Sequence, residues 1–187
     1  MSLLRENGEM SDEAQADSPN LTAAEQYKAR LAAYVKDKDP IAMQHETPGI
    51  LARLIAGVSA QRLKREPGKW SICAILAHLA EDEIASAWRY RQMLENSGTV
   101  LPGFDQNQWA QLGNYNTWEP REALEMFRLL REANLRMFAR LTPEQWRCFG
   151  MHTERGRITV RDLASQIAGH DMSHIEQARQ ILANSEN

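Results

Sequence analysis

The sequence predicts an all-α protein, in which four main helices form a bundle with one long crossover loop and a further helix precedes them. Apolar residues recur three, four and seven positions apart in several long segments, as on a helix that turns one face to a core. Residues that cap helix starts stand at the beginnings of those segments. Neither the alternation of apolar and polar residues that is typical of strands nor an internal repeat is found in the sequence.

Length and composition limit the class of protein. The 187 residues fit one domain with a sizeable core, and 43% hydrophobic and 25% charged residues are typical of a soluble globular protein. The net charge of −3 leaves no basic surplus to neutralise phosphates, so nucleic-acid binding is not expected. Membrane association through a spanning helix is not expected either, because no apolar run approaches ~20 residues.

The first residues and the cysteines indicate a compartment. Residues 1–20 are polar and lack the apolar stretch of a secretory signal, so they predict a disordered arm. Cys73 lies in an apolar segment and Cys148 in a connection, and both are expected to be free thiols. A cytoplasmic location is therefore the default expectation.

The N-terminal part of the chain predicts two helices and a loop. Residues 21–38 are expected to form the additional helix, and the bundle domain is expected to span residues 39–187. The first bundle helix is predicted over residues 48–58, which carry a stripe of isoleucine, leucine and valine at helical spacing. Residues 62–69 predict a basic loop that would hold an anionic substrate if it lay near an active site.

The second bundle helix has a clear start. Ser71 is a suitable N-cap, and Trp70 before it pairs with Ile75 after it as a hydrophobic staple. Residues 72–96 run without proline or glycine, and a glycine follows where the helix is expected to end. Residues 99–118 predict a long aromatic loop that acts as a lid or packed cover rather than as a tether.

The C-terminal part of the chain predicts two further bundle helices. The third is expected over residues 121–141, with a proline near its start and Thr117 as a candidate cap. Residues 142–145 form a capping box for a short helix, and residues 154–158 are expected to be an extended connection. A second capping box opens the last helix, which is predicted to run to about residue 183.

Three of the five histidines predict a metal site. His170 and His174 are four residues apart, so both imidazoles lie on one helix face and can reach the same ion. His78 lies among apolar residues of a different predicted helix, whereas His45 and His152 are predicted to be surface residues in loops. Buried neutral imidazoles need polar partners, and one divalent ion satisfies three of them. The sequence therefore predicts a three-histidine site with an open position for water or substrate.

Other interpretations of these histidines are weaker but stay open. A histidine in a helix is more often a satisfied or exposed residue than a ligand, so a metal-free bundle with buried histidines is one alternative. The run His170-Asp171-x-x-His174 resembles the zinc-protease motif, but no further histidine follows it as a third ligand. Adjacent helix residues point ~100° apart, which disfavours a phosphohydrolase site that uses the His-Asp doublet. A ferritin-like di-iron site needs a Glu-x-x-His pair on two helices, which the sequence lacks.

Several polar residues near the histidines are candidates for supporting roles. Asp82, four residues after His78, and the adjacent Glu83 are candidate general bases or hydrogen-bond acceptors for a ligand imidazole. The alternative for these two carboxylates is a solvated acidic face of the helix. Gln166 and Gln177 flank the C-terminal histidine pair and are candidates for orienting a ligand or the substrate.

Four short motifs together resemble the DinB-like superfamily, which includes metal-dependent hydrolases of the YfiT type and bacillithiol and mycothiol S-transferases. The resemblance covers roughly residues 39–182. The motifs are Lys69-Trp70-Ser71, His78-Leu79-x₃-Glu83, Leu101-Pro102-Gly103-Phe104-Asp105 and Gly169-His170-Asp171-x₂-His174-x₂-Gln177.

The resemblance implies more than the residue pattern alone. It implies a four-helix bundle of up-up-down-down topology, frequent homodimers, and a zinc, nickel or similar divalent ion on three histidines. Carried over by position, those ligands are His78, His170 and His174.

The expected function is a divalent-metal-dependent enzyme that acts on a small molecule. In one version the ion activates a low-molecular-weight thiol as in an S-transferase, and in the other it activates water as in a hydrolase. The alternative from a different class is a non-catalytic metal-binding or stress-response module with the same three histidines.

Overall fold

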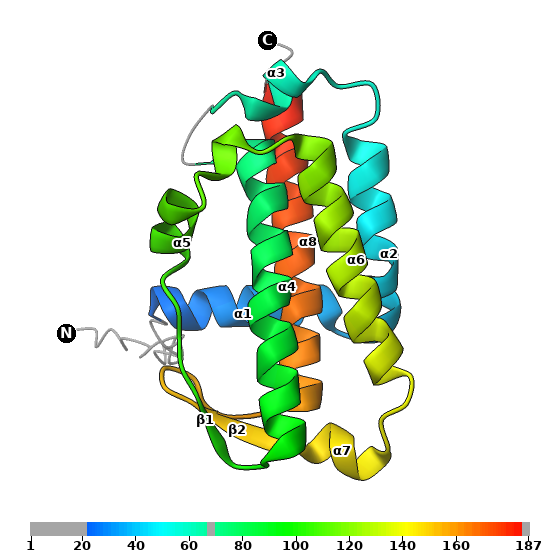
Figure 1. The fold of residues 1–187 in the computed structure, drawn as a ribbon, viewed down its shortest axis with the longest axis vertical. Helices are drawn as coiled ribbons and strands as arrows, with labels where there is room; N and C mark the ends of the chain where they lie inside the picture. The colour runs from blue at the N-terminus through cyan, green and yellow to red at the C-terminus, as the bar shows by residue number, and fades with distance from the viewer. Residues whose placement is uncertain (1–21, 67–69, 185–187) are drawn as a thin grey trace, which may run out of the picture.

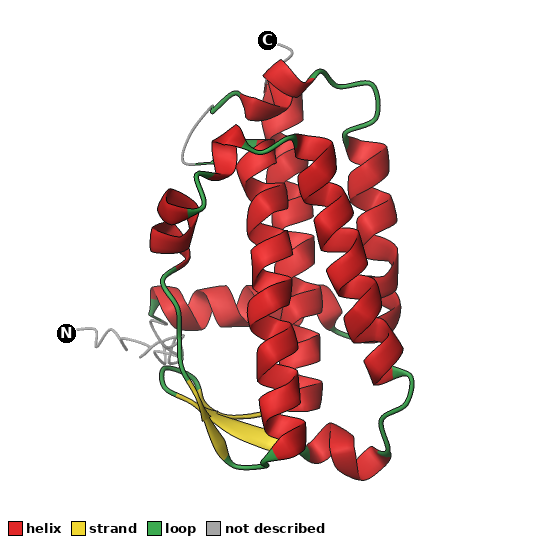
Figure 2. Cartoon of the chain, in the orientation of Figure 1, coloured by secondary structure: helices red, strands yellow, loops and turns green. Residues whose placement is uncertain are grey.

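The structure is a computed structural model that describes residues 22–66 and 70–184 (Figures 1 and 2). The predicted arm over residues 1–20 and Lys69 of the predicted basic loop lie outside the described residues. The additional helix is present as α1 (Ala23–Val35), and Thr22 and Glu25 form a capping box at its start.

Four long helices form the bundle, as predicted: α2 (Pro40–Leu54), α4 (Ile72–Glu95), α6 (Pro120–Phe138) and α8 (Val160–Asn184). In Figure 1, α2 and α8 run in one direction and α4 and α6 in the other. Counted from α2, the order along the chain is up-down-down-up, with two parallel pairs of helices, rather than the up-up-down-down order that the resemblance implies. The long crossover connects the parallel neighbours α4 and α6, while α1 lies across the bundle.

One predicted helix start is confirmed, one is wrong, and one predicted cap is wrong. Ser71 caps α4, and its hydroxyl accepts a hydrogen bond from the backbone amide of Ala74. Helix α2 begins at Pro40 rather than at residue 48, because Asp39 caps it and Pro40 fits the first helical turn. Helix α6 follows Glu119, whose side chain makes no capping hydrogen bond, so Thr117 is not the cap.

A small sheet replaces two of the predicted irregular segments. It contains β1 (Thr99–Leu101), β2 (Phe149–His152) and β3 (Gly156–Thr159), with β1 parallel to β2 and β2 antiparallel to β3 (Figure 2). The sequence shows no strand pattern, so these three strands are not predicted. Strands of three and four residues are too short to show a recognisable alternation.

Short helices fill the connections. They are α3 (Ala60–Lys64), α5 (Gln106–Leu112), the 3₁₀ turn η1 (Tyr115–Thr117) and α7 (Pro143–Arg147). The predicted basic loop is thus partly helical, and the crossover is partly ordered into β1, α5 and η1.

The end of the crossover packs against α4. Tyr115 is buried, and the thiol of Cys73 lies 3.4 Å and 3.1 Å from the carbonyl oxygens of Tyr115 and Trp118. This part of the crossover is therefore a packed cover rather than a tether. Cys73 and Cys148 are both free thiols, as predicted.

The core has two apolar clusters with a polar layer between them. One cluster includes Leu76 and Ile175, and the other includes Tyr90 and Leu163. Between these levels the four bundle helices contribute buried polar side chains, among them Arg131. Within the described residues, no helix carries an apolar stretch long enough to cross a bilayer.

Helix α1 approaches α8 at a glycine. A Cβ atom on Gly169 would lie 2.4 Å from the backbone carbonyl oxygen of Leu31, which is closer than any real contact. Leu31 is itself buried. The glycine therefore allows α1 to cross α8 at the residue before His170.

We expect Gly169→Ala to destabilise the protein by about 1–3 kcal/mol, because the backbone of α1 must move away from the added methyl group. Urea unfolding measures the loss, and hydrogen exchange of α1 shows whether that helix is the part affected. Gly49→Ala is the matched control, since its nearest neighbour is the flexible end of Arg53 at 3.4 Å. Equal stability of Gly169→Ala and the wild type would contradict the close approach.

Candidate metal centre

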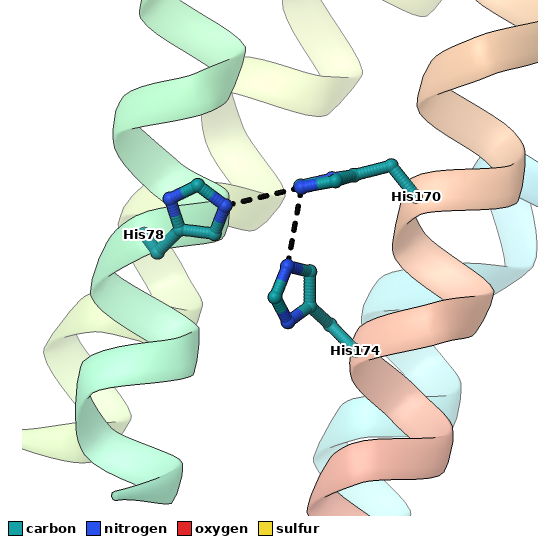
Figure 3. A group of neighbouring side chains, drawn as sticks. All are labelled: His78, His170 and His174. Atoms are coloured by element: carbon teal, nitrogen blue, oxygen red, sulfur yellow. Dashed lines mark hydrogen bonds between the residues drawn. The ribbon is translucent and has the colours of Figure 1, made fainter. Parts of the chain in front are cut away.

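The three predicted histidines lie together between α4 and α8 (Figure 3). His78 comes from α4, and His170 and His174 come from successive turns of α8. The Nε2 atom of His170 lies 3.1 Å from Nε2 of His78 and 3.1 Å from Nε2 of His174. One ligand atom from each residue lies within 4.8 Å of the others, so the three imidazoles converge on a single point.

The spacing of the nitrogens fits a shared ion. Two nitrogens that each lie ~2.0–2.1 Å from a tetrahedral zinc ion are ~3.3–3.4 Å apart. The two 3.1 Å separations are close to this value. A neutral imidazole offers one N–H and one lone pair, so Nε2 of His170 can form an ordinary hydrogen bond with only one of its two neighbours at a time. A cation that accepts three lone pairs accommodates all three rings.

Gln177 fixes the tautomer of one histidine. The Nδ1 atom of His174 lies 3.0 Å from Oε1 of Gln177. A carbonyl oxygen only accepts, so Nδ1 carries the proton and Nε2 keeps its lone pair for a metal. The Nδ1 atom of His170 is buried without a hydrogen-bond partner among the described residues, and the Oδ2 atom of Asp82 lies 3.6 Å from it.

Burial keeps the three imidazoles neutral. It lowers the pKa of His78 well below its usual value, and the neighbouring His170 and His174 act in the same direction. Burial also lowers the pKa of His170 to about 4 and that of His174 to about 3. At neutral pH the rings therefore have free lone pairs, so a metal ion need not displace protons from them.

Aromatic side chains form one wall of the centre. The ring of Trp70 stacks on His174 with a centroid separation of 6.0 Å and meets His78 edge-on at 4.7 Å. Tyr115 of η1 packs against Trp70, and its hydroxyl donates a 2.7 Å hydrogen bond to Glu81 of α4. Tyr115 of the crossover thus holds Trp70 in place against the histidines.

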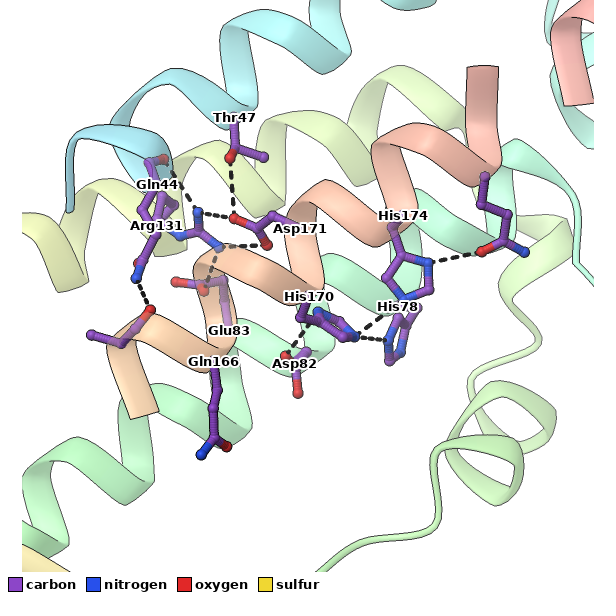
Figure 4. Close-up of polar contacts among 12 residues, drawn as sticks. Gln44, Thr47, His78, Asp82, Glu83, Arg131, Gln166, His170, Asp171 and His174 are labelled. Atoms are coloured by element: carbon purple, nitrogen blue, oxygen red, sulfur yellow. Dashed lines mark hydrogen bonds and ion pairs between the residues drawn. The ribbon is translucent and has the colours of Figure 1, made fainter. Parts of the chain in front are cut away.

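Behind the histidines, a buried arginine connects all four bundle helices (Figure 4). The guanidinium of Arg131 on α6 donates to both carboxylate oxygens of Asp171 at 2.6 Å and 3.1 Å and to Glu83 at 2.9 Å. It also donates to the backbone carbonyl of Gln44 on α2. Thr47 of α2 completes this network through a 3.1 Å hydrogen bond from its hydroxyl to Asp171. All three charged side chains are at most 2% exposed.

Asp82 and Glu83, the two candidate carboxylates, have different neighbours. Asp82 lies beside His170, and burial together with the charge of Glu83 raises the pKa of Asp82 to about 6. Glu83 is not brought to the histidines, because its carboxylate accepts hydrogen bonds from Arg131 and Asn134. Arg131 is not among the residues that the sequence predicts for the site. A signal existed, since Arg131 lies on the same face of α6 as the buried rings of Phe127 and Phe138.

Other predicted residues lie away from the centre. Lys64 of the basic segment pairs with Glu119, and Arg62 donates to the carbonyl of Leu182 near the end of α8. His152 is not a surface residue: it is 4% exposed in β2, and its Nδ1 atom accepts a hydrogen bond from the backbone of Glu154. His45 is exposed, as predicted, but lies within α2 rather than in a loop.

We expect Gln177→Leu to weaken divalent-metal binding about 10–100-fold, because His174 loses the acceptor that holds its proton on Nδ1. Competition with a chromophoric chelator measures the affinity. Gln166→Leu is the control, since Gln166 lies on the same helix but contacts Arg155 rather than a histidine. An unchanged affinity in Gln177→Leu would contradict the role of this hydrogen bond.

Comparisons with known proteins agree with the fold and with a metal. A model of the DinB superfamily matches residues 41–178. The protein OB0413 of Oceanobacillus iheyensis, named as a candidate metal-dependent hydrolase, is 27% identical over 119 residues, which cover 63% of this chain and 68% of that protein. YfiT of Bacillus subtilis, which carries the same description, is 21% identical over 160 residues, or 83% of this chain and 90% of the relative.

The solved structure of YfiT, described as having an unusual four-helix bundle topology, has the same fold. It superposes with a TM-score of 0.72 at 18% identity and covers 90% of this chain and 93% of its own.

Proposed function

The chain belongs to the DinB superfamily, and from this membership together with the geometry of its histidines we propose that it is a metal-dependent hydrolase of small molecules. The proposal rests on one observation: Nε2 atoms from two helices converge at 3.1 Å separations. The names of the relatives, which describe candidate metal-dependent hydrolases, support the same reaction class.

His78, His170 and His174 are the residues that would hold the ion. A divalent ion at three histidines supplies a Lewis acid that lowers the pKa of water and polarises the bond to be cleaved. With three protein ligands, a coordination position is left for water or substrate. The donor set of three imidazoles suits zinc, nickel, copper and iron alike. Which of these metals the protein binds is therefore a question for experiment.

The neighbouring side chains orient the histidines. Gln177 holds the Nδ1 proton of His174. Asp82 lies on the Nδ1 side of His170, away from the point on which the Nε2 atoms converge, so we assign it to positioning that ring. Glu83 and Asp171 hold Arg131, which ties α4 and α8 to α6 and so fixes the distance between the helices that carry the ligands. Trp70 limits the access of water on one side.

The test compares hydrolysis with thiol transfer in one set of protein samples. The protein is stripped with a chelator, loaded separately with zinc, nickel, cobalt or manganese, and assayed on a panel of activated esters and amides. The same samples are assayed with monochlorobimane and bacillithiol, mycothiol or glutathione. We expect metal-dependent hydrolysis that is lost in His170→Ala and kept in His45→Ala, whose imidazole is exposed on α2.

Two outcomes would overturn this proposal. Thiol-dependent conjugation without hydrolysis would replace the hydrolase by a thiol S-transferase at the same site. Stoichiometric metal without turnover in either assay would indicate a non-catalytic metal-binding module.

A further inference from the structure

Helix α1 lies outside the part of the chain that matches the family model, yet it reaches the candidate metal centre. The match begins at residue 41, whereas α1 ends at Val35. The crossing of α1 and α8 occurs at Gly169, directly before His170. Further along, the Tyr34 hydroxyl donates to Glu176, two residues after His174. The three-histidine site in this chain is therefore bordered by a helix that lies outside the match to the family model.

The exposed side of α1 brings an arginine and a tyrosine to the centre. The guanidinium carbon of Arg30 lies 5.3 Å from the ring centroid of Tyr27. The negative charge of Asp82 helps burial to raise the pKa of the Tyr27 phenol, and the charges of Arg155 and Arg30 oppose that rise. Arg30 also helps to lower the pKa of His174. Arg30 directly precedes Leu31, whose backbone carbonyl lies against Gly169, so Arg30 stands where α1 crosses α8.

A second arginine near the centre belongs to the hairpin of the small sheet. Arg155 lies in the turn between β2 and β3, and its Nη1 atom donates a 3.3 Å hydrogen bond to Oε1 of Gln166. Gln166 precedes His170 by four residues, so it lies one turn away on the same face of α8. The charge of Arg155 also helps to lower the pKa of His170 and opposes the rise in the pKa of Asp82. In Figure 1, the beginning of α1 and the strands both lie to the left of α4.

The positive charges of the Arg30 and Arg155 guanidinium groups are available to bind an anion. Arg30 and Arg155 are exposed, and among the described residues neither forms an ion pair with a carboxylate. By contrast, the arginine nearest to the back of the histidines, Arg131, is fully engaged by two acids. An arginine fork binds a carboxylate or phosphate through two parallel hydrogen bonds. Asp82 and Glu176 lie nearby, so a singly charged carboxylate meets less repulsion here than a doubly charged phosphate does.

We propose that Arg30 and Arg155 form a recognition site for a carboxylate group of the substrate, at the rim of the three-histidine centre. This inference rests on the proposed function and names the class of its substrate: a small molecule that carries a carboxylate beside the bond that reacts. The hydrogen bond to Gln166 positions Arg155, and the ring of Tyr27 positions Arg30. Helix α1 thereby gives this chain a selectivity that the family-matched region does not supply by itself.

The test uses cobalt-loaded protein and three thiols of similar size, 3-mercaptopropionate, 2-mercaptoethanol and cysteamine. Each binds cobalt through sulfur, and the near-ultraviolet absorption of the cobalt–thiolate pair reports the dissociation constant without any turnover. We expect 3-mercaptopropionate to bind about tenfold more tightly than 2-mercaptoethanol, and cysteamine to bind the least tightly, because only the first thiol offers a carboxylate to the arginines.

Variants assign the preference to the two arginines. The double variant Arg30→Gln/Arg155→Gln is expected to lose the preference for 3-mercaptopropionate while its affinity for 2-mercaptoethanol is unchanged. Arg157→Gln is the matched control, because Arg157 lies in the same hairpin but stacks on Phe149, 4.1 Å from the ring centroid. Cobalt stoichiometry and circular dichroism confirm that each variant is folded and loaded.

The outcomes separate the two proposals. Equal affinity of the wild type for 3-mercaptopropionate and 2-mercaptoethanol would overturn the carboxylate site and leave the metal centre intact. Survival of the preference in the double variant would overturn the assignment to Arg30 and Arg155. A wild-type protein that binds no cobalt would overturn the metal centre and the recognition site together.

Discussion

Replacement of Arg131 by methionine is expected to lower the free energy of unfolding by about 3–5 kcal/mol. The substitution removes the cation that Asp171 and Glu83 share and leaves two buried carboxylates without a counter-charge. Methionine has a similar length, so the loss reports the charge rather than an empty space. Urea unfolding followed by circular dichroism measures the change in free energy.

Arg128→Met is the matched control for this measurement. Arg128 lies one turn earlier on α6, and its ion pairs with Glu125 and Glu132 are exposed, so its loss has a much smaller effect. Asp171→Asn provides a milder variant should Arg131→Met fail to fold, because the amide oxygen still accepts a hydrogen bond from Arg131. A loss below about 1 kcal/mol in Arg131→Met would contradict the role of this network.

A divalent ion is expected to raise the melting temperature of the chelator-stripped protein by about 5–10 °C when its free concentration is a hundred times the dissociation constant. The ion binds the folded state, in which α4 and α8 hold the three Nε2 atoms together, and not the unfolded chain, in which the histidines are far apart. Differential scanning calorimetry with and without the metal measures the shift.

His170→Ala is expected to abolish this shift, since the Nε2 atom of His170 is the one that lies 3.1 Å from both of the others. His45→Ala keeps the shift, because His45 is exposed on α2 and remote from the cluster in the sequence. An equal shift in His170→Ala and the wild type would place the stabilising ion elsewhere.

The sequence predicts the elements whose signals are local. Helix α4 is predicted because its cap, staple and uninterrupted length all lie within one segment. The histidine pair on α8 is predicted because four-residue spacing on a helix determines which side chains share a face. His78 joins that pair because apolar neighbours indicate an inward-facing position, and the structure places it there at 2% exposure.

Features that depend on partners distant in the sequence are missed. Arg131 resembles an ordinary surface charge until Glu83 of α4 and Asp171 of α8 are known to meet it. The strand β1 is too short for a pattern of its own and exists because β2, about fifty residues later, pairs with it. Likewise, no local signal shows that α1, which carries Arg30, and the turn that carries Arg155 both contact α8.

The most direct test of the three-histidine centre is the metal content of the protein as purified from cells grown with zinc, nickel, iron and manganese, measured by plasma mass spectrometry. We predict close to one divalent ion per wild-type chain and per His45→Ala chain, and nearly none in His78→Ala, His170→Ala and His174→Ala. The same metal content in the wild type and in all three of these variants would contradict the account.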